Sequence, residues 1–93
     1  MKYRFNEDVI LKDIKNYIDD TYSQHYANGK YQATDVIIDS GHGESFCIGN
    51  MLKYIMRYKK KGDKKDSEKD LLKVIHYAVI SLYINRKQRE DNE

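Results

Sequence analysis

Apolar residues recur at intervals of three and four along most of this chain, which is the spacing of one face of an α-helix. The first such segment follows Asn6, a residue type that caps helices, and opens with the acidic residues Glu7 and Asp8. We expect this helix to end near Tyr22. The face predicted to be buried consists of Ile10, Leu11, Ile14, Tyr17 and Ile18.

The second strong segment is predicted to be helical from Phe46 to Lys61 and reads FCIGNMLKYIMRYKKK. Gly49 lies inside it, and a glycine within a helix costs roughly 1 kcal/mol relative to alanine. We therefore expect a neighbouring backbone or a ligand to come close to Gly49. The face predicted to be buried consists of Cys47, Ile48, Met51, Leu52, Ile55 and Met56.

The last helix is predicted to begin at Ser67, because Ser67 and Asp70 match a capping box. It follows a charged connection that contains Gly62, and it is expected to fray into the charged tail formed by residues 86–93. The predicted buried positions are Leu71, Ile75, Ala78 and Leu82, flanked by Leu72, Val74 and Val79.

Shorter segments connect these helices. Asn28 and Gly29 are a turn signal, and residues 34–39 form a short apolar stretch that fits either a turn of helix or a strand. Residues 40–45 read SGHGES and open onto a helix, so this loop is either a phosphate-binding helix start or a hinge. It matches neither GxxxxGK[ST] nor GxGxxG.

Composition favours an all-α fold. The chain has no proline and 34% charged residues, and helical periodicity covers most of it. We predict a single domain over residues 1–93, with three main helices plus a short helical turn. A chain of 93 residues buries only about 60–65% of its unfolded surface, so we also expect a homo-oligomer.

The charge is concentrated in one region. The formal net charge is +2, but seven cations lie between Lys53 and Lys65, where Asp63 is the one acid. A local positive patch suits a small anion, such as a phosphate or nucleotide, at least as well as a long polyanion. Five residues share one face of the second helix at spacings of three and four: Asn50, Lys53, Tyr54, Arg57 and Lys61.

This pattern has an alternative interpretation. Cations near a helix C-terminus are favoured by the helix dipole, so the lysines and arginine can simply be solvated on an amphipathic helix. The nine tyrosines also allow two interpretations, since they can stack on a base or line helix contacts. The tyrosines considered for stacking are Tyr26, Tyr31, Tyr54, Tyr58 and Tyr77.

Several classes of site are disfavoured. One cysteine cannot form a disulfide framework, and Cys47 on an apolar face is expected to be a core residue. The residues capable of metal ligation, His25, His42, His76 and Cys47, do not pair at the spacing of a zinc site, so we expect neither a metal nor a cofactor. The acids do not repeat as the paired carboxylates of all-α pyrophosphohydrolases.

No segment predicts a membrane span, and the first residues lack the apolar run of a signal peptide. We therefore expect a cytoplasmic protein.

Four short motifs carry a family resemblance: His25-Tyr26, Asp35-Val36-Ile37, Phe46-x-x-Gly49-Asn50-x-x-Lys53-Tyr54-x-x-Arg57-Tyr58 and Asp70-Leu71-x-Lys73-x-x-x-Tyr77. Over residues 25–83 the chain resembles a small phage domain of unknown function that is related to a phage nucleotide kinase. The resemblance implies a phage protein in the host cytoplasm that is all-α and multimeric, with deoxynucleoside monophosphates among the family substrates. The family kinase is longer, so its catalytic residues can lie outside the part that is matched here.

Two functions follow. In the first, the chain binds a small nucleotide, such as a host defence signal, and sequesters it. In the second, it is a deoxynucleoside monophosphate kinase without a Walker motif, in which the same cations neutralise the transferred phosphoryl group. Binding of nucleic acid or of a host protein remains a third possibility. The residues predicted to bind the ligand are His25, Tyr26, Asn50, Lys53, Tyr54, Arg57, Tyr58 and Lys61.

Overall fold

The computed structural model describes residues 2–25, 30–60 and 64–91. These residues form four helices and no strand, so the predicted all-α class is confirmed. No helix among them has the length and apolar character needed to cross a membrane. The helices are α1 (Glu7–His25), α2 (Lys30–Asp39), α3 (Gly43–Arg57) and α4 (Lys64–Asp91).

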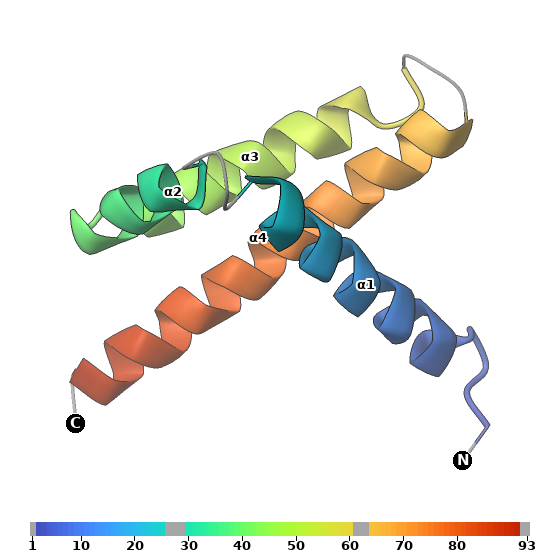
Figure 1. Ribbon diagram of the computed structural model, residues 1–93, viewed down its shortest axis with the longest axis horizontal. Helices are drawn as coiled ribbons and strands as arrows, with labels where there is room; N and C mark the ends of the chain where they lie inside the picture. Colours follow the sequence, from blue (N-terminus) through green and yellow to red (C-terminus); the bar gives the residue numbers. More distant parts are fainter. Residues whose placement is uncertain (1, 26–29, 61–63, 92–93) are drawn as a thin grey trace.

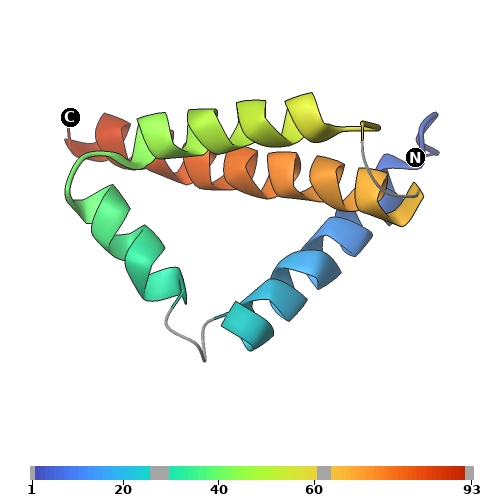
Figure 2. The ribbon, with the colours of Figure 1, turned by 90° about the horizontal axis from the view of Figure 1, so that it is seen from above.

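The helices α3 and α4 lie antiparallel and form a hairpin (Figure 1). The other two helices form a V on one side of the hairpin (Figure 2). The middle of α1 packs against α4, where Tyr17 meets His76, and the C-terminal end of α2 leads into α3. Seen from above, the four helices trace a triangle with the hairpin as one side (Figure 2).

Aromatic and small side chains join α3 to α4. Cys47 has no exposed surface, and Ile84 on α4 is buried. The rings of Tyr54 and Tyr77 stack with their centroids 6.2 Å apart, and Phe46 meets Tyr77 edge to face at 5.8 Å. Such aromatic pairs add roughly 0.5–1.5 kcal/mol each beyond the area that they bury.

Gly43 lies where α2, α3 and α4 meet. A Cβ atom at this position would lie 2.9 Å from Ile84 Cδ1, 3.0 Å from Ile38 Cγ1 and 3.3 Å from Ile38 Cα. Just before it, Gly41 has a φ of 89°, a conformation that glycine adopts without strain. The two glycines therefore have separate roles, since Gly41 allows the turn and Gly43 the close packing.

Several predicted boundaries were wrong. The first helix continues past Tyr22 to His25, and α3 begins at Gly43 and ends at Arg57. The segment over residues 34–39, expected as either a turn of helix or a strand, is helical and belongs to the longer helix α2. Asn6 precedes α1 as expected, but with a left-handed φ of 56°. The turn predicted at Asn28 and Gly29 lies outside the described residues.

The capping box was also wrong. Because α4 begins at Lys64, Ser67 lies inside the helix and not at its N-cap. Asp66 is the acidic residue in the first turn, where it interacts favourably with the helix dipole. At the other end α4 continues to Asp91 through most of the predicted tail, because Arg, Lys, Gln and Glu are good helix formers.

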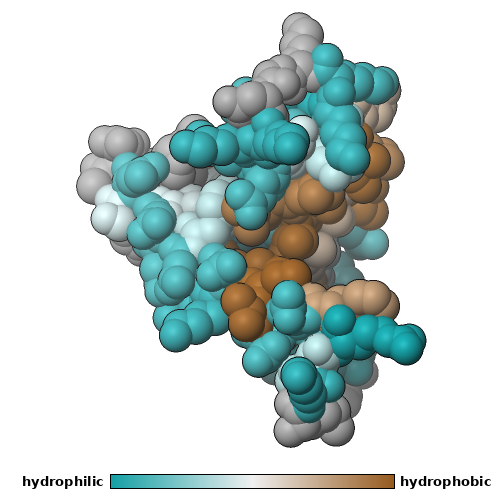
Figure 3. Space-filling view, turned by 90° about the vertical axis from the view of Figure 1, so that its right-hand side faces the viewer, coloured by the Kyte–Doolittle hydropathy of each residue, from teal (hydrophilic) through white to brown (hydrophobic). Residues whose placement is uncertain are grey.

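The largest difference concerns which face of each helix is buried. Leu71 and Leu82, predicted to be buried on α4, are 40% and 49% exposed, while Asp70 and His76 are buried. Gly49 has open space around it, so no part of the described chain makes the expected close approach, while approach by a ligand stays a prediction. Apolar side chains thus reach the surface in a continuous band (Figure 3). The other predicted core residues that are exposed are Ile10, Leu11, Ile48, Leu52, Ile55, Met56, Ala78 and Val79.

The two helical glycines provide the first prediction. Gly43→Ala should lower the free energy of unfolding by about 1–3 kcal/mol, because Ile38 and Ile84 would have to shift. Gly49→Ala, the matched control, should raise it by up to about 1 kcal/mol, because its Cβ would meet open space. Urea unfolding followed by circular dichroism measures both. A loss of stability in Gly49→Ala would reveal a neighbour that the single chain does not contain.

Candidate functional site

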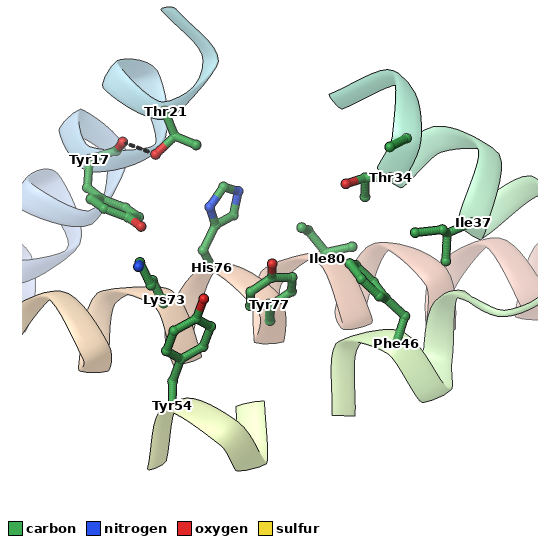
Figure 4. Close-up of a pocket in the computed structure, with 11 residues that line it drawn as sticks. Tyr17, Thr21, Thr34, Ile37, Phe46, Tyr54, Lys73, His76, Tyr77 and Ile80 are labelled. Carbon is green, nitrogen blue, oxygen red and sulfur yellow. Dashed lines mark hydrogen bonds between the residues drawn. The ribbon is translucent and has the colours of Figure 1, made fainter. Parts of the chain in front are cut away.

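The space between the V and the hairpin contains a cavity of about 440 Å³ to which all four helices contribute (Figure 4). This volume lies within the range of small-molecule sites, roughly 300–1,000 Å³. The lining is mainly aromatic and aliphatic, with a few polar groups, as such sites usually are. The lining residues are Tyr17, Thr21, Ala33, Thr34, Ile37, Phe46, Tyr54, Lys73, His76, Tyr77 and Ile80.

The polar groups of the cavity come together at one end. Figure 4 shows the hydroxyl oxygens of Tyr17 and Tyr54 and the amine of Lys73 lying near one another, with the imidazole of His76 alongside. The Tyr17 and His76 rings meet edge to face with their centroids 6.0 Å apart. The opposite end, around Phe46, Ile37 and Ile80, is mainly apolar, with the hydroxyl of Thr34 on the same side.

Three cations surround the ring of Tyr54. The Nζ atoms of Lys53 and Lys73 lie 4.6 and 4.9 Å from the ring centroid, and Arg57 Cζ lies at 5.6 Å. Each is attracted to the face of the ring, but the three like charges repel one another. An anion beside Tyr54 would relieve this repulsion.

One carboxylate lies beside this cluster. Asp70 is buried, and its Oδ1 lies 3.7 Å from Arg57 Nε. The Arg57 side chain is 55% exposed, so it can hold Asp70 with one edge and face solvent with the rest. Within the described residues neither Lys53 nor Lys73 has a carboxylate partner. The three cations and Asp70 together carry a net charge of about +2 at neutral pH.

Three buried titratable groups of the cavity, Tyr17, His76 and Tyr77, favour their neutral forms at pH 7. Burial raises the pKa of Tyr17 and of Tyr77, so both phenols keep their protons. Burial lowers the pKa of His76 from its usual value of 6.5, which favours the neutral imidazole. The cavity therefore offers neutral hydrogen-bonding groups inside and positive charge around Tyr54.

The structure brings together three of the predicted ligand-binding residues, Lys53, Tyr54 and Arg57. Asn50 is half-buried, and its Nδ2 donates a hydrogen bond of 2.9 Å to the carbonyl of Phe46 on the same helix. Tyr58 follows α3 and does not line the cavity. Lys59 Nζ lies 5.3 Å from the centroid of its ring. His25 is the last residue of α1 and its side chain is not described, and Tyr26 and Lys61 lie outside the described residues.

Other cavity residues were not predicted as ligand-binding. Tyr17 was assigned to the core of the first helix, and His76 was considered only for metal ligation. Lys73 had a usable signal, because it lies four residues before Tyr77, one helical turn away, in the motif around Asp70. Tyr17 had none, since only the approach of α1 to α4 brings it to the site.

Cys47 has the role of a core residue. Burial raises the pKa of its thiol, and a smaller effect of the nearby Ser81 hydroxyl opposes that rise. Ser81 Oγ makes no hydrogen bond of ordinary geometry within the described residues, so the contact is weak. Among the same residues, no group of three His, Cys, Asp or Glu side chains is placed to hold a metal ion.

The Arg57–Asp70 pair can be tested by a double-mutant cycle. Arg57→Met should lower the free energy of unfolding by about 1–3 kcal/mol, because it leaves a buried carboxylate without its cation. In the Asp70→Asn background the same change should cost less than about 0.5 kcal/mol, since no charge remains to be balanced. Equal losses in both backgrounds would mean that another group balances the charge of Asp70.

His76 predicts a dependence of stability on pH. Because its pKa is lower in the folded protein, the unfolded chain binds more protons once the pH falls through about 6.5. The free energy of unfolding should therefore fall by up to about 1 kcal/mol between pH 7.5 and 5.5. Urea unfolding at fixed protein concentration measures it. His76→Gln should flatten the profile, whereas the matched change His42→Gln, at an exposed residue, should preserve it.

Comparison with known proteins gives a family. Residues 21–79 match the model of a family described as a protein of unknown function (DUF3310). No curated protein and no solved structure matched the chain. The expected resemblance to a domain of unknown function is confirmed, while its link to nucleotide kinases stays a prediction. The matched stretch includes every residue that lines the cavity except Tyr17 and Ile80. Because it covers more than half of the chain, the protein belongs to the DUF3310 family.

Proposed function

We propose that this protein binds a small nucleotide, with the base in the aromatic cavity and the phosphate beside Tyr54. The observation that carries the proposal is the cluster of Lys53, Arg57 and Lys73 around one tyrosine ring at the edge of the cavity. A phosphate accepts charge-assisted hydrogen bonds from such cations and offsets their repulsion.

The cavity suits the other half of a nucleotide. Tyr54, Tyr77 and Phe46 present ring faces and edges on which a base can stack. The hydroxyl of Tyr17 and the imidazole of His76 are neutral partners for base or sugar hydrogen bonds. Apolar walls with a few polar groups support a specific small ligand more than a long polyanion, which would follow an open basic groove.

Binding without turnover is the version that we favour. Among the described residues, the acid beside the cations is Asp70, which is buried against Arg57 and is therefore poorly placed to bind magnesium with a second nucleotide. Together with the resemblance to a phage domain, this supports a phage protein that sequesters a host nucleotide signal in the host cytoplasm. A deoxynucleoside monophosphate kinase uses the same cations and is the second candidate. The test below separates the two.

Calorimetric titration with nucleoside monophosphates, triphosphates and cyclic dinucleotides should identify a ligand that binds one site per chain. Lys53→Ala and Lys73→Ala should each weaken its binding by about tenfold, as expected for loss of one charge-assisted contact. Lys12→Ala, the matched control on the exposed surface of α1, should leave affinity unchanged. All three variants should retain the helicity of the parent protein.

The fate of the ligand separates the candidates. A nucleotide recovered intact supports sequestration, whereas phosphorylation of a monophosphate in the presence of a triphosphate would establish the kinase. Affinity that rises with oligonucleotide length and falls steeply with salt would instead indicate nucleic-acid binding. Binding that Lys53→Ala and Lys73→Ala leave unchanged would contradict the assignment of the site.

A further inference from the structure

The hairpin has a second apolar surface on the side away from the cavity. We call it the outer face and define it by Ile48, Leu52, Ile55 and Met56 on α3 and by Leu71, Ile75, Ala78, Val79 and Leu82 on α4. A groove of about 350 Å³ joins the two stripes, and no residue of α1 or α2 lines it. It lies between Ile48 and Met51 on one side and Ala78 and Leu82 on the other.

The exposed surface of the whole chain is large enough to leave room for a partner on this face. The chain exposes 7763 Å², whereas a folded monomer of its mass exposes about 5,700 Å². The excess of about 2,000 Å² is larger than the roughly 800 Å² per partner of a standard interface. The radius of gyration, 14.8 Å, also exceeds the value of about 12 Å for a compact domain of this length.

The spacing of the apolar residues indicates what kind of partner fits. Leu71, Ile75, Ala78 and Leu82 are spaced four, three and four apart, and Ile48, Leu52 and Ile55 are spaced four and three apart. This is the repeat that places side chains along the seam between packed helices. Two helices that carry such seams side by side are half of a four-helix bundle.

Charge complementarity selects a second copy of this chain. Glu68 and Arg86 are exposed, and both lie on the side of α4 that carries the outer face, nine residues before and nine residues after Tyr77. In an antiparallel pair of α4 helices related by a two-fold axis at the level of Tyr77, Glu68 of each copy would lie opposite Arg86 of the other. Such an interface is isologous, so the same pair forms twice.

The same axis also aligns α3. The contacts of Gly43 with Ile84 and of Arg57 with Asp70 place Asn50 of α3 at the level of Tyr77 of α4. An axis through this level sets Ile48 of one copy opposite Leu52 of the other. We propose that two copies of this chain pack their outer faces together as an antiparallel four-helix bundle, with Glu68 and Arg86 paired across the two-fold axis.

Sedimentation equilibrium of the full chain and its variants tests this. The parent should be a dimer or a multiple of dimers. Glu68→Arg and Arg86→Glu should each raise the dimer dissociation constant by about tenfold, because like charges then face each other twice. The double reversal should return it to within about threefold of the parent value. Asp13→Arg, a charge reversal on the exposed surface of α1, should have no effect.

Leu82→Lys should abolish dimerisation. Because that variant can also fail to fold, the charge reversals decide the matter, since they leave the apolar seam intact. The proposal would be overturned if the parent protein were still a monomer at about 100 μM. It would also be overturned if the double reversal associated no better than the single reversals. A monomeric parent would leave the outer face to a different protein.

Discussion

The stacking of Tyr54 on Tyr77 between α3 and α4 is the contact on which the rest of the structure depends. It fixes the level at which the two helices pair, and it holds Tyr54 where Lys53, Arg57 and Lys73 all reach its ring. The same pairing closes one wall of the cavity and turns the apolar stripes of both helices to the outer face. The candidate site and the candidate interface are therefore two sides of one hairpin.

The small size of the chain explains why both sides of the hairpin are candidates for binding. Within the described residues the buried apolar side chains are few: Ile14, Cys47 and Ile84. The V of α1 and α2 covers one side of the hairpin but leaves a cavity there, so it adds little buried area. A chain with so small a core gains stability most readily from ligand in the cavity or from a partner on the outer face.

The edge of the cavity and its interior differ in charge. The cations cluster where α3 and α4 pass the cavity, and burial keeps the inner groups neutral. Asp70 fixes one cation, Arg57, to the hairpin, and this leaves the lysines to respond to an anion. Positive charge at the edge and neutral donors inside match the phosphate end and the base end of the ligand that we propose.

By itself the sequence determined the helical class and the positions of the polar and apolar stripes, because both follow from local periodicity. Lys53, Tyr54 and Arg57 were predictable as neighbours for the same reason, since residues three and four apart share a helix face. Helix ends were less predictable: Ser67 has the chemistry of a cap, yet α4 begins three residues earlier because nothing in Lys64–Asp66 interrupts a helix.

Only the tertiary structure decided which stripe meets which helix. The stripe through Leu71 and Leu82 is the more apolar one, but α4 packs its other side, with His76 and Tyr77, against α1 and α3. That choice brought Tyr17 to the cavity and left Leu82 at the surface. Periodicity defines a face of a helix but carries no information about what covers it, because that depends on contacts between residues far apart in the chain.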